Sequence, residues 1–163
     1  MRCNIVSGML RRFVPLVLAL ACVAPAQKYD GPRPPKPDLP YLKHASDLVP
    51  TETSEAKEEK QKADTLYIVE GAGSPARTPL ASPIFLFVSS KIVPEKLGLY
   101  KLDVKGGHRE ILFGPKKQPK PILIEVTHLD GNLYRLEVSD SLEPGEYSLS
   151  PEGSNQVFCF AVF

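Results

Sequence analysis

Hydrophobic and polar residues alternate along most of the second half of the chain, and no other feature limits the fold as much. In the stretch LYRLEV, the residues Tyr134, Leu136 and Val138 share one face of a strand. Arg135 and Glu137 lie on the opposite face, which is therefore expected to be mostly exposed to solvent. Alternation with a period of two is typical of an antiparallel sheet that rests one side on a core. The sequence thus predicts an all-β fold.

Eight segments carry this pattern, and turn residues separate them. They span residues 66–69, 84–89, 99–104, 109–113, 122–129, 133–138, 146–149 and 157–162. The stretches KGG and DGN predict tight hairpins, because glycine and asparagine tolerate positive φ. Two such sheets packed together make a β-sandwich of about 100 residues. We therefore predict one antiparallel β-sandwich domain of about seven to eight short strands at residues 64–163.

The stretch LEPGEYSL carries a second, local signal. It contains the pattern L-x-P-G-x-Y, which begins at Leu142 and ends at Tyr147. This pattern resembles the start of a late strand in Ig-like and fibronectin-III-like bacterial modules, where the tyrosine packs under the turn and the last strand pairs beside it. The resemblance implies an Ig-like sandwich. The stretches GSPARTPLASPIFLF and PGEYSLSPEGSNQVFCF are also similar to small exported bacterial proteins of unassigned function.

The first 26 residues follow the order of a secretory signal peptide. Arg11 and Arg12 form a positively charged region, and an apolar run over residues 13–23 comes next. Ala24 and Ala26 then form an A-x-A cleavage site. The apolar run is shorter than the stretch of about 20 residues that a membrane-spanning helix needs. We therefore expect an exported protein, periplasmic or secreted, with no transmembrane segment after signal removal.

Cys22 leaves an alternative open. It follows the small residue Ala21 at the end of the apolar run, as the lipidated cysteine of a bacterial lipoprotein does, and lipidation would make the chain a lipid-anchored outer-membrane protein. Otherwise Cys22 is discarded with the signal. Whether translation starts at Met1 or Met9 also stays open. After signal removal the chain keeps a single cysteine, Cys159, so no internal disulfide can form and the fold must depend on packing.

Residues 27–63 differ in composition from the rest of the chain. Five prolines lie between Gly31 and Pro40, and proline fixes φ and lacks an N–H, so this stretch predicts an extended spacer. In the charged stretch TETSEAKEEKQKAD, Thr53 or Ser54 can cap a helix. The pattern predicts a short, solvated helix without an apolar face. We expect residues 27–63 to form a Pro-rich spacer and charged helical linker that folding does not require.

The sequence lacks the spacings of known catalytic or metal sites. His44, His108 and His128 have no second ligand at a metal-binding interval. Cys159 lies in an apolar strand, where a thiolate is disfavoured. The 20 basic and 19 acidic residues leave a net charge of +1, which gives no long-range field for nucleic acid. We expect no cofactor, no metal, no nucleic-acid partner and no enzymatic activity, with an enzyme of unrecognised type as an alternative.

The last predicted strand, in VFCFAVF, is apolar on both faces. We assign Phe158, Phe160 and Val162 to the core, because burying a phenylalanine stabilises by roughly 1.5 to 3 kcal/mol. The other face carries Val157, Cys159, Ala161 and Phe163. That face is expected either to lie under a local loop or to form a surface for a partner.

Together these features predict an exported, non-catalytic module of the cell envelope that binds a protein or glycan partner. A small outer-membrane β-barrel is an alternative, since such barrels also end on an aromatic residue such as Phe163. Strand length argues against it. Barrel strands need about 9 to 11 residues to cross a bilayer, and most of the predicted strands are shorter.

Overall fold

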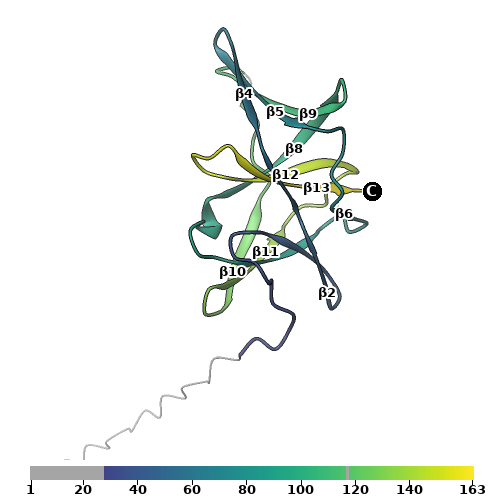
Figure 1. Cartoon of the computed structure of the whole chain (residues 1–163), viewed down its shortest axis with the longest axis vertical. Helices are drawn as coiled ribbons and strands as arrows, with labels where there is room; N and C mark the ends of the chain where they lie inside the picture. Colours follow the sequence, from purple (N-terminus) through teal and green to yellow (C-terminus); the bar gives the residue numbers. More distant parts are fainter. Residues whose placement is uncertain (1–27, 117) are drawn as a thin grey trace, which may run out of the picture.

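The computed structural model describes residues 28–116 and 118–163 (Figure 1). The predicted signal peptide, its predicted cleavage site at Ala24 and Ala26, and the lipidation alternative at Cys22 lie outside the described residues. Within them the chain forms strands and one 3₁₀ turn, η1 (Pro94–Lys96), so the all-β prediction is confirmed. None of the helical segments in the described part of the chain is long and apolar enough to span a membrane.

The strands follow one another with short connections. They are β1 (Tyr41–His44), β2 (Asp47–Pro50), β3 (Glu52–Glu55), β4 (Lys57–Gln61), β5 (Asp64–Glu70), β6 (Arg77–Thr78), β7 (Ile84–Val88), β8 (Leu97–Lys105), β9 (His108–Phe113), β10 (Ile124–Asp130), β11 (Leu133–Val138), β12 (Gly145–Pro151) and β13 (Gln156–Val162). The eight segments with a period of two all form strands, β5 and β7 to β13.

These strands form two sheets. The first has the order β10-β11-β7-β1-β2, and the larger one has the order β3-β13-β12-β8-β9-β5-β4, with β6 beside the end of β13. Neighbours are antiparallel except β6 and β13, which are parallel. The five-stranded sheet lies at the lower end of Figure 1, and β4, β5 and β9 lie at the upper end.

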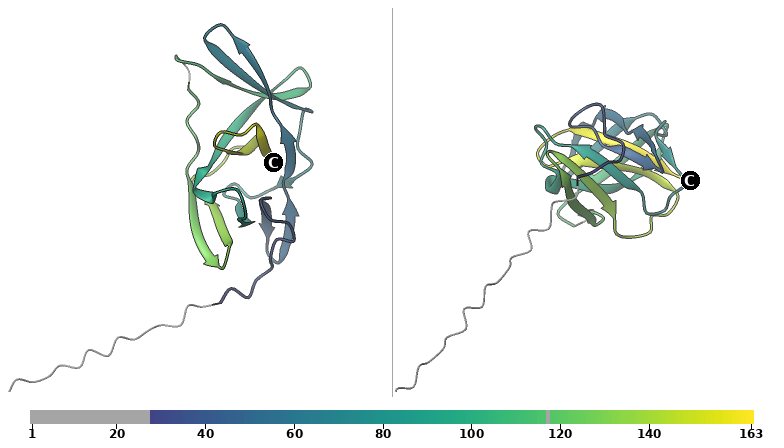
Figure 2. Two further views of the ribbon diagram at one scale, coloured as in Figure 1. Left: turned by 60° about the vertical axis from the view of Figure 1, so that its left-hand side comes forward. Right: turned by 90° about the horizontal axis from the view of Figure 1, so that it is seen from below.

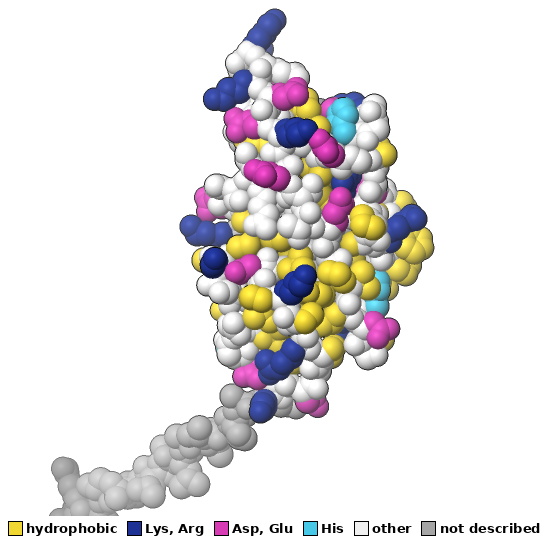
Figure 3. Space-filling view, in the orientation of Figure 1, with side chains coloured by type: hydrophobic (Ala, Val, Ile, Leu, Met, Phe, Trp, Pro, Cys, Tyr) yellow, Lys and Arg dark blue, Asp and Glu magenta, His cyan; other side chains and the backbone are white. Residues whose placement is uncertain are grey.

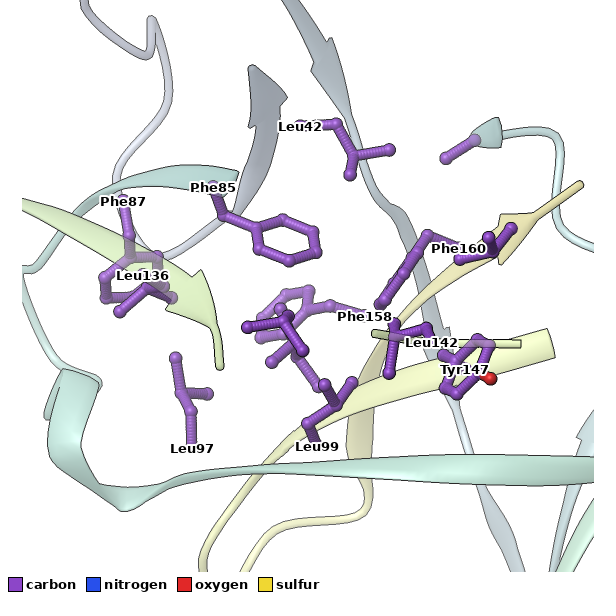
Figure 4. Packing of buried hydrophobic residues seen from close by; sticks show 14 residues of the cluster. Leu42, Phe85, Phe87, Leu97, Leu99, Leu136, Leu142, Tyr147, Phe158 and Phe160 are labelled. Carbon is purple, nitrogen blue, oxygen red and sulfur yellow. The ribbon is translucent and has the colours of Figure 1, made fainter. Parts of the chain in front are cut away.

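The main core lies between the five-stranded sheet and the β8–β12–β13 part of the larger sheet (Figure 4). It contains Leu42, Phe85, Phe87, Leu136 and Val138 from the first sheet and Leu97, Leu99, Tyr147, Leu149, Phe158, Phe160 and Val162 from the second. The ring of Phe160 meets the edge of Phe85 at 5.0 Å between centroids and stacks on Tyr147 at 5.6 Å. The predicted facing of the last strand is therefore confirmed, and the two sheets pack as in a sandwich.

Both predicted hairpins are confirmed. Gly106 and Gly107, with φ of 56° and 83°, join β8 to β9. Gly131, with φ of 59°, and Asn132 join β10 to β11. Positive φ at these turn positions is costly for residues with a Cβ and nearly free for glycine, which is why the short stretches were informative.

The predicted charged helix is wrong, because its residues form β3 and β4. Strand β3 pairs with β13, and β4 pairs with β5 through a turn at Lys62, whose φ is 58°. A helix without an apolar face gains almost nothing from tertiary contacts, whereas the strand gains pairing partners and buries Ala56. All five residues of β4 are exposed, and charges on an edge strand discourage pairing with other chains. Figure 3 shows side chains of both signs around this end of the molecule.

The Pro-rich segment lies against the sheets. Residues 28–40 contain no strand, as the prolines predict, but the carboxylate of Asp38 accepts hydrogen bonds from the N–H groups of Ser90, Lys91 and Ile92 at 2.8, 2.9 and 3.1 Å. Burial raises the pKa of Asp38, but these hydrogen bonds outweigh it, and the pKa lies below its ordinary value. The segment is therefore anchored at Asp38.

The packed fold also begins earlier than the predicted boundary at residue 64. Leu39 packs against the main core, and Leu42 in β1 is fully buried within it. Strand β1 lies between β7 and β2, and β3 pairs with β13. The expectation of a linker up to residue 63 is thus wrong from Asp38 onward. It was based on the composition of the segment, which indicates neither the pairing of its strands nor the burial of Leu42.

Candidate functional site

The two edge strands of the larger sheet, β3 and β4, follow each other directly in the chain, and the sheet curves around a cup. Strands β3 and β4 form one bent segment that continues through Ala56, whose N–H donates to the carbonyl of Asn155 at 2.8 Å. Its first half pairs with β13 and its second half with β5. Strand β8 likewise pairs with β12 first and with β9 at its end. In the left view of Figure 2, the yellow β12–β13 hairpin lies between β8 and β3.

Alternate residues of these strands point into the cup, which has a volume of about 970 Å³. Its lining includes the apolar Ala56, Val69, Leu102, Ile111 and Val157 and the aromatic Tyr67, Tyr100 and Phe113. A second hydrophobic cluster, separate from the main core, joins Ala56, Val69, Leu102, Val157 and Cys159 with Tyr67 and Ile111. The cup therefore has an apolar wall built from four strands, β5, β8, β9 and β13, and from Ala56, which lies between β3 and β4.

Three aromatic rings mark the more exposed part of the wall. Phe113 meets Tyr67 and Tyr100 edge to face, each at 5.6 Å between centroids. All three are half-buried, whereas Leu102 and Val69 are buried, so the aromatic side chains lie nearer the opening. Burial raises the pKa of Tyr100, which keeps its hydroxyl protonated and able to donate a hydrogen bond at neutral pH.

The opposite end of the cup is closed by a buried ion cluster. Arg109, Ile111 and Phe113 alternate along β9, so Arg109 points to the same side but away from the opening. Its side chain is 0% exposed and donates to both carboxylate oxygens of Glu52, at 2.7 and 2.9 Å. It also donates to the carbonyl oxygens of Gly71 and Glu70, at 3.0 and 2.7 Å.

Two acidic residues balance this buried charge. Burial raises the pKa of Glu52, but the hydrogen bonds from Arg109 and Ser74 outweigh it and hold the pKa below its ordinary value. Glu146 lies 3.7 Å from Arg109 and accepts a hydrogen bond from the N–H of Ser74 at 2.9 Å. The carboxylates therefore compensate Arg109 and tie the loop containing Ser74 to the floor of the cup.

The proposed partner surface on the last strand is largely buried. Val157 is buried in the wall of the cup, and Cys159 and Ala161 are buried beside the loop at residues 71–76, so these three residues do not form an exposed partner surface. Phe163 alone of the four is open, at 60% exposure, and its ring centre lies 4.8 Å from the guanidinium carbon of Arg77. Of the two alternatives for this face, the structure shows the one in which other parts of the chain cover it.

The chemistry of Cys159 agrees with its position. Burial raises the pKa of Cys159 to about 12, so the group stays a neutral thiol. The hydroxyl of Ser74 donates to the carbonyl oxygen of Cys159 at 3.1 Å, which fixes the loop over it. This residue contributes to packing in the cup wall.

The three histidines lie apart, each with its own neighbour. His44 Nε2 lies 3.0 Å from the hydroxyl of Thr78, and His108 Nε2 lies 3.0 Å from a carboxylate oxygen of Glu110. His128 contacts a backbone carbonyl. Within residues 28–116 and 118–163, no group of three or more His, Cys, Asp or Glu side chains is placed to hold a metal ion.

Comparison with protein-family models, with curated proteins and with solved structures finds no match. The cup is therefore the feature on which a function can be argued. Sequence reasoning missed Tyr67, Tyr100, Phe113 and Arg109 as a group. The alternating positions were visible in separate strands, but they did not show that β9 pairs with β5 as well as with β8, which places Phe113 beside both Tyr67 and Tyr100.

Proposed function

We propose that the protein is an exported, non-catalytic module of the cell envelope that binds a protein or glycan partner through the cup. The observation that carries this proposal is a preformed cavity of about 970 Å³ with an aromatic opening and an apolar wall. Binding sites for small ligands and side chains have volumes of about 300 to 1,000 Å³ and mostly apolar linings.

The polar groups around the cup support binding more than catalysis. The guanidinium of Arg109 is occupied by Glu52 and by backbone carbonyls, and the thiol of Cys159 is held protonated. The hydroxyls of Ser148 and Ser150 lie 3.3 Å apart and pair with each other. These groups fix the shape of the cup and leave its wall as the surface that a ligand meets.

We also propose that the sandwich is Ig-like, and the turn before β12 supports this. The hydroxyl of Tyr147 donates to the carbonyl oxygen of Glu143 at 2.7 Å, four residues upstream. A tyrosine that bonds back to the preceding turn is a feature of Ig-like sandwiches. The export part rests on the signal-like order of residues 11–26.

A binding assay on the exported chain tests the proposal. The chain contains no tryptophan, so tyrosine emission, to which Tyr67 and Tyr100 contribute, can report an occupied cup. The probes are soluble muropeptides for the glycan class and short synthetic peptides with a Phe-Leu core for the protein class. Tyr100→Ala should weaken binding of the active probe, whereas Tyr134→Ala, on the five-stranded sheet, should not. Equal binding by the two variants would place the site elsewhere.

A further inference from the structure

We infer that the cup binds a short segment of a partner protein. In this segment an aromatic or aliphatic side chain is flanked by lysine or arginine residues. This inference rests on the proposed function and names the partner within it. The apolar side chain enters the cup, and the cationic groups stay at its opening.

The inner end of the cup offers no free charge for a ligand. Arg109 is paired with Glu52 through two hydrogen bonds and lies 3.7 Å from Glu146. Between this cluster and the opening, the wall is formed by side chains such as Leu102 and Val157. A group that enters this far loses contact with water and finds apolar neighbours, so an apolar side chain is favoured there.

The same wall disfavours a sugar ring. Hydroxyls that enter the cup would exchange water for an apolar surface, which is unfavourable for each one left without a hydrogen bond. Ser148 is buried, and its hydroxyl already faces that of Ser150 at 3.3 Å. The lining therefore matches the side chain of a protein better than a glycan.

The charges at the opening favour a cationic partner. Four exposed charged residues line it, namely Glu58, Glu95, Lys96 and Glu152. The ammonium of Lys96 lies 3.4 Å from the carboxylate of Glu152, which offsets that pair. Among the residues that the structure describes, Glu58 and Glu95 form no ion pair. The uncompensated charge at the opening is therefore negative.

The aromatic side chains near the opening reinforce this preference. Tyr67, Tyr100 and Phe113 are half-buried and present part of their surface to the cup. A lysine or arginine side chain that lies over the face of such a ring is attracted by the quadrupole of the ring. An anionic segment is not attracted by the rings, and the glutamates at the opening repel it.

The test uses the exported chain and four peptides of equal length. Three share a Phe-Leu core and differ in the residues beside it, which are lysine, glutamine or glutamate. The fourth keeps the lysines and replaces the core by serine. A soluble muropeptide serves as the glycan probe. We expect the lysine peptide with the apolar core to bind about three- to tenfold more tightly than the glutamine peptide, with the difference shrinking as salt is added.

Two double variants of the protein locate the effect. Glu58→Gln with Glu95→Gln should reduce the affinity for the lysine peptide toward that for the glutamine peptide and leave the affinity for the glutamine peptide unchanged. The part of the lysine preference that comes from the aromatic rings should remain. Glu59→Gln with Glu125→Gln changes the net charge equally, but Glu59 alternates with Glu58 along β4 and Glu125 lies on β10, so affinity should stay the same. Tyr100→Ala should weaken both peptides.

Each outcome decides one of the two proposals. Tighter binding of the glutamate peptide, or equal binding of the serine-core peptide, overturns the inference. Binding of the muropeptide that is lost in Tyr100→Ala, with no peptide bound, also overturns the inference but supports the proposed function. If no probe binds in a way that depends on Tyr100, the inference and the assignment of function to the cup both fail.

Discussion

Arg109 keeps a full positive charge in the interior at 0% exposure, and the carboxylate of Glu52 compensates it most directly. Removing one member of a buried ion pair leaves the other charge without compensation, which costs about 3 to 5 kcal/mol. We expect Glu52→Gln to reduce the free energy of unfolding by about 3 kcal/mol, the lower value, because Glu146 still lies 3.7 Å away. Urea unfolding at pH 7 measures the change.

Glu143→Gln is the matched control for this substitution. The carboxylate of Glu143 accepts a hydrogen bond from Lys101 at 2.8 Å but is largely exposed, so solvent screens the pair and the unfolding midpoint should barely move. If the two glutamine variants unfold at the same urea concentration, Glu52 does not stabilise Arg109 in the way the distances indicate.

The same ion pair makes stability depend on pH. The pKa of Glu52 is lowered in the folded state, so the folded state favours the ionised carboxylate. The resulting stabilisation is complete above the unfolded pKa of about 4.3 and is lost as the pH falls through the lower folded pKa. The difference in free energy of unfolding between the wild type and Glu52→Gln should therefore shrink below pH 4.3 or so. A constant difference from pH 7 to pH 3 would contradict this assignment.

The two faces of β13 are a second test of single side chains. Phe160 is fully buried between Phe85 and Tyr147, so Phe160→Ala should cost about 3 to 5 kcal/mol. Phe163 is 60% exposed, and Phe163→Ala should change the free energy by about 0.5 kcal/mol or less. Thermal and urea unfolding of both variants at one pH provide the comparison.

Ala161→Asp extends this comparison to the other face. With an open face the substitution would be mild, but Ala161 is buried, and its N–H donates to the carbonyl of Ala76. A carboxylate there would be buried without a partner, so the variant should be strongly destabilised. Near-normal stability would mean that the loop at residues 71–76 does not cover this face.

Among the strands, the sequence predicted those with alternation and missed those without it. The stretch LYRLEV matches β11 residue for residue, because its apolar side chains repeat every second position. Strand β4 carries KEEKQ, with no apolar residue at all, and its local preference is helical. What makes it a strand is the pairing with β5, a contact that local propensity cannot report.

The N-terminal strands give a prediction about folding. Removing residues 28–63 deletes β1 and β2, which lie beside β7 in the five-stranded sheet, and deletes β3 and β4, which pair with β13 and β5 in the larger sheet. It also removes Leu42 from the main core. We expect a chain that starts at residue 64 to lose the cooperative thermal transition that a chain starting at Lys28 shows, when circular dichroism follows both.

A matched substitution separates packing from chain length. In the chain that starts at Lys28, Leu42→Ala should cost about 2 to 5 kcal/mol, because the side chain is fully buried. Lys43→Ala in the same strand removes a half-buried polar side chain and should have a small effect. If the chain starting at residue 64 melts like the longer one, strands β1 to β4 are accessory to a fold that stands without them.

The cup depends on more than any one strand. Its lining was predictable in part, since Tyr67, Tyr100 and Phe113 each occupy one side of an alternating segment. These sides face a common cavity because two segments each pair with two different neighbours. Strand β8 pairs with β12 and β9, and the β3–β4 segment pairs with β13 and β5. Both long segments change neighbours part-way along, and a period of two does not indicate where a strand bends or what it pairs with.

Residues 28–116 and 118–163 contain one cysteine, Cys159, so packing within this part of the chain does not indicate an oxidising or a reducing compartment. Cys159 is a free, buried thiol whose pKa is raised to about 12 by burial. The destination of the chain must therefore be tested at its N-terminus. We expect export and cleavage after Ala26, because a basic region, an apolar run and an A-x-A site occur there in the order that signal peptidase requires. Intact mass of the exported protein should correspond to residues 27–163.

Substitutions at the cleavage site make this test specific. Ala26→Lys places a large charged residue where a small one is needed, so the signal should stay attached to the chain. Pro25→Ser changes the middle position of the site, which tolerates many residues, so cleavage should still occur and the product should have the mass of residues 27–163. A diacylglycerol adduct on Cys22 would instead establish the lipid-anchored form. A cytoplasmic protein that retains Met1 or Met9 would overturn export, and with it the proposal that the protein acts in the cell envelope.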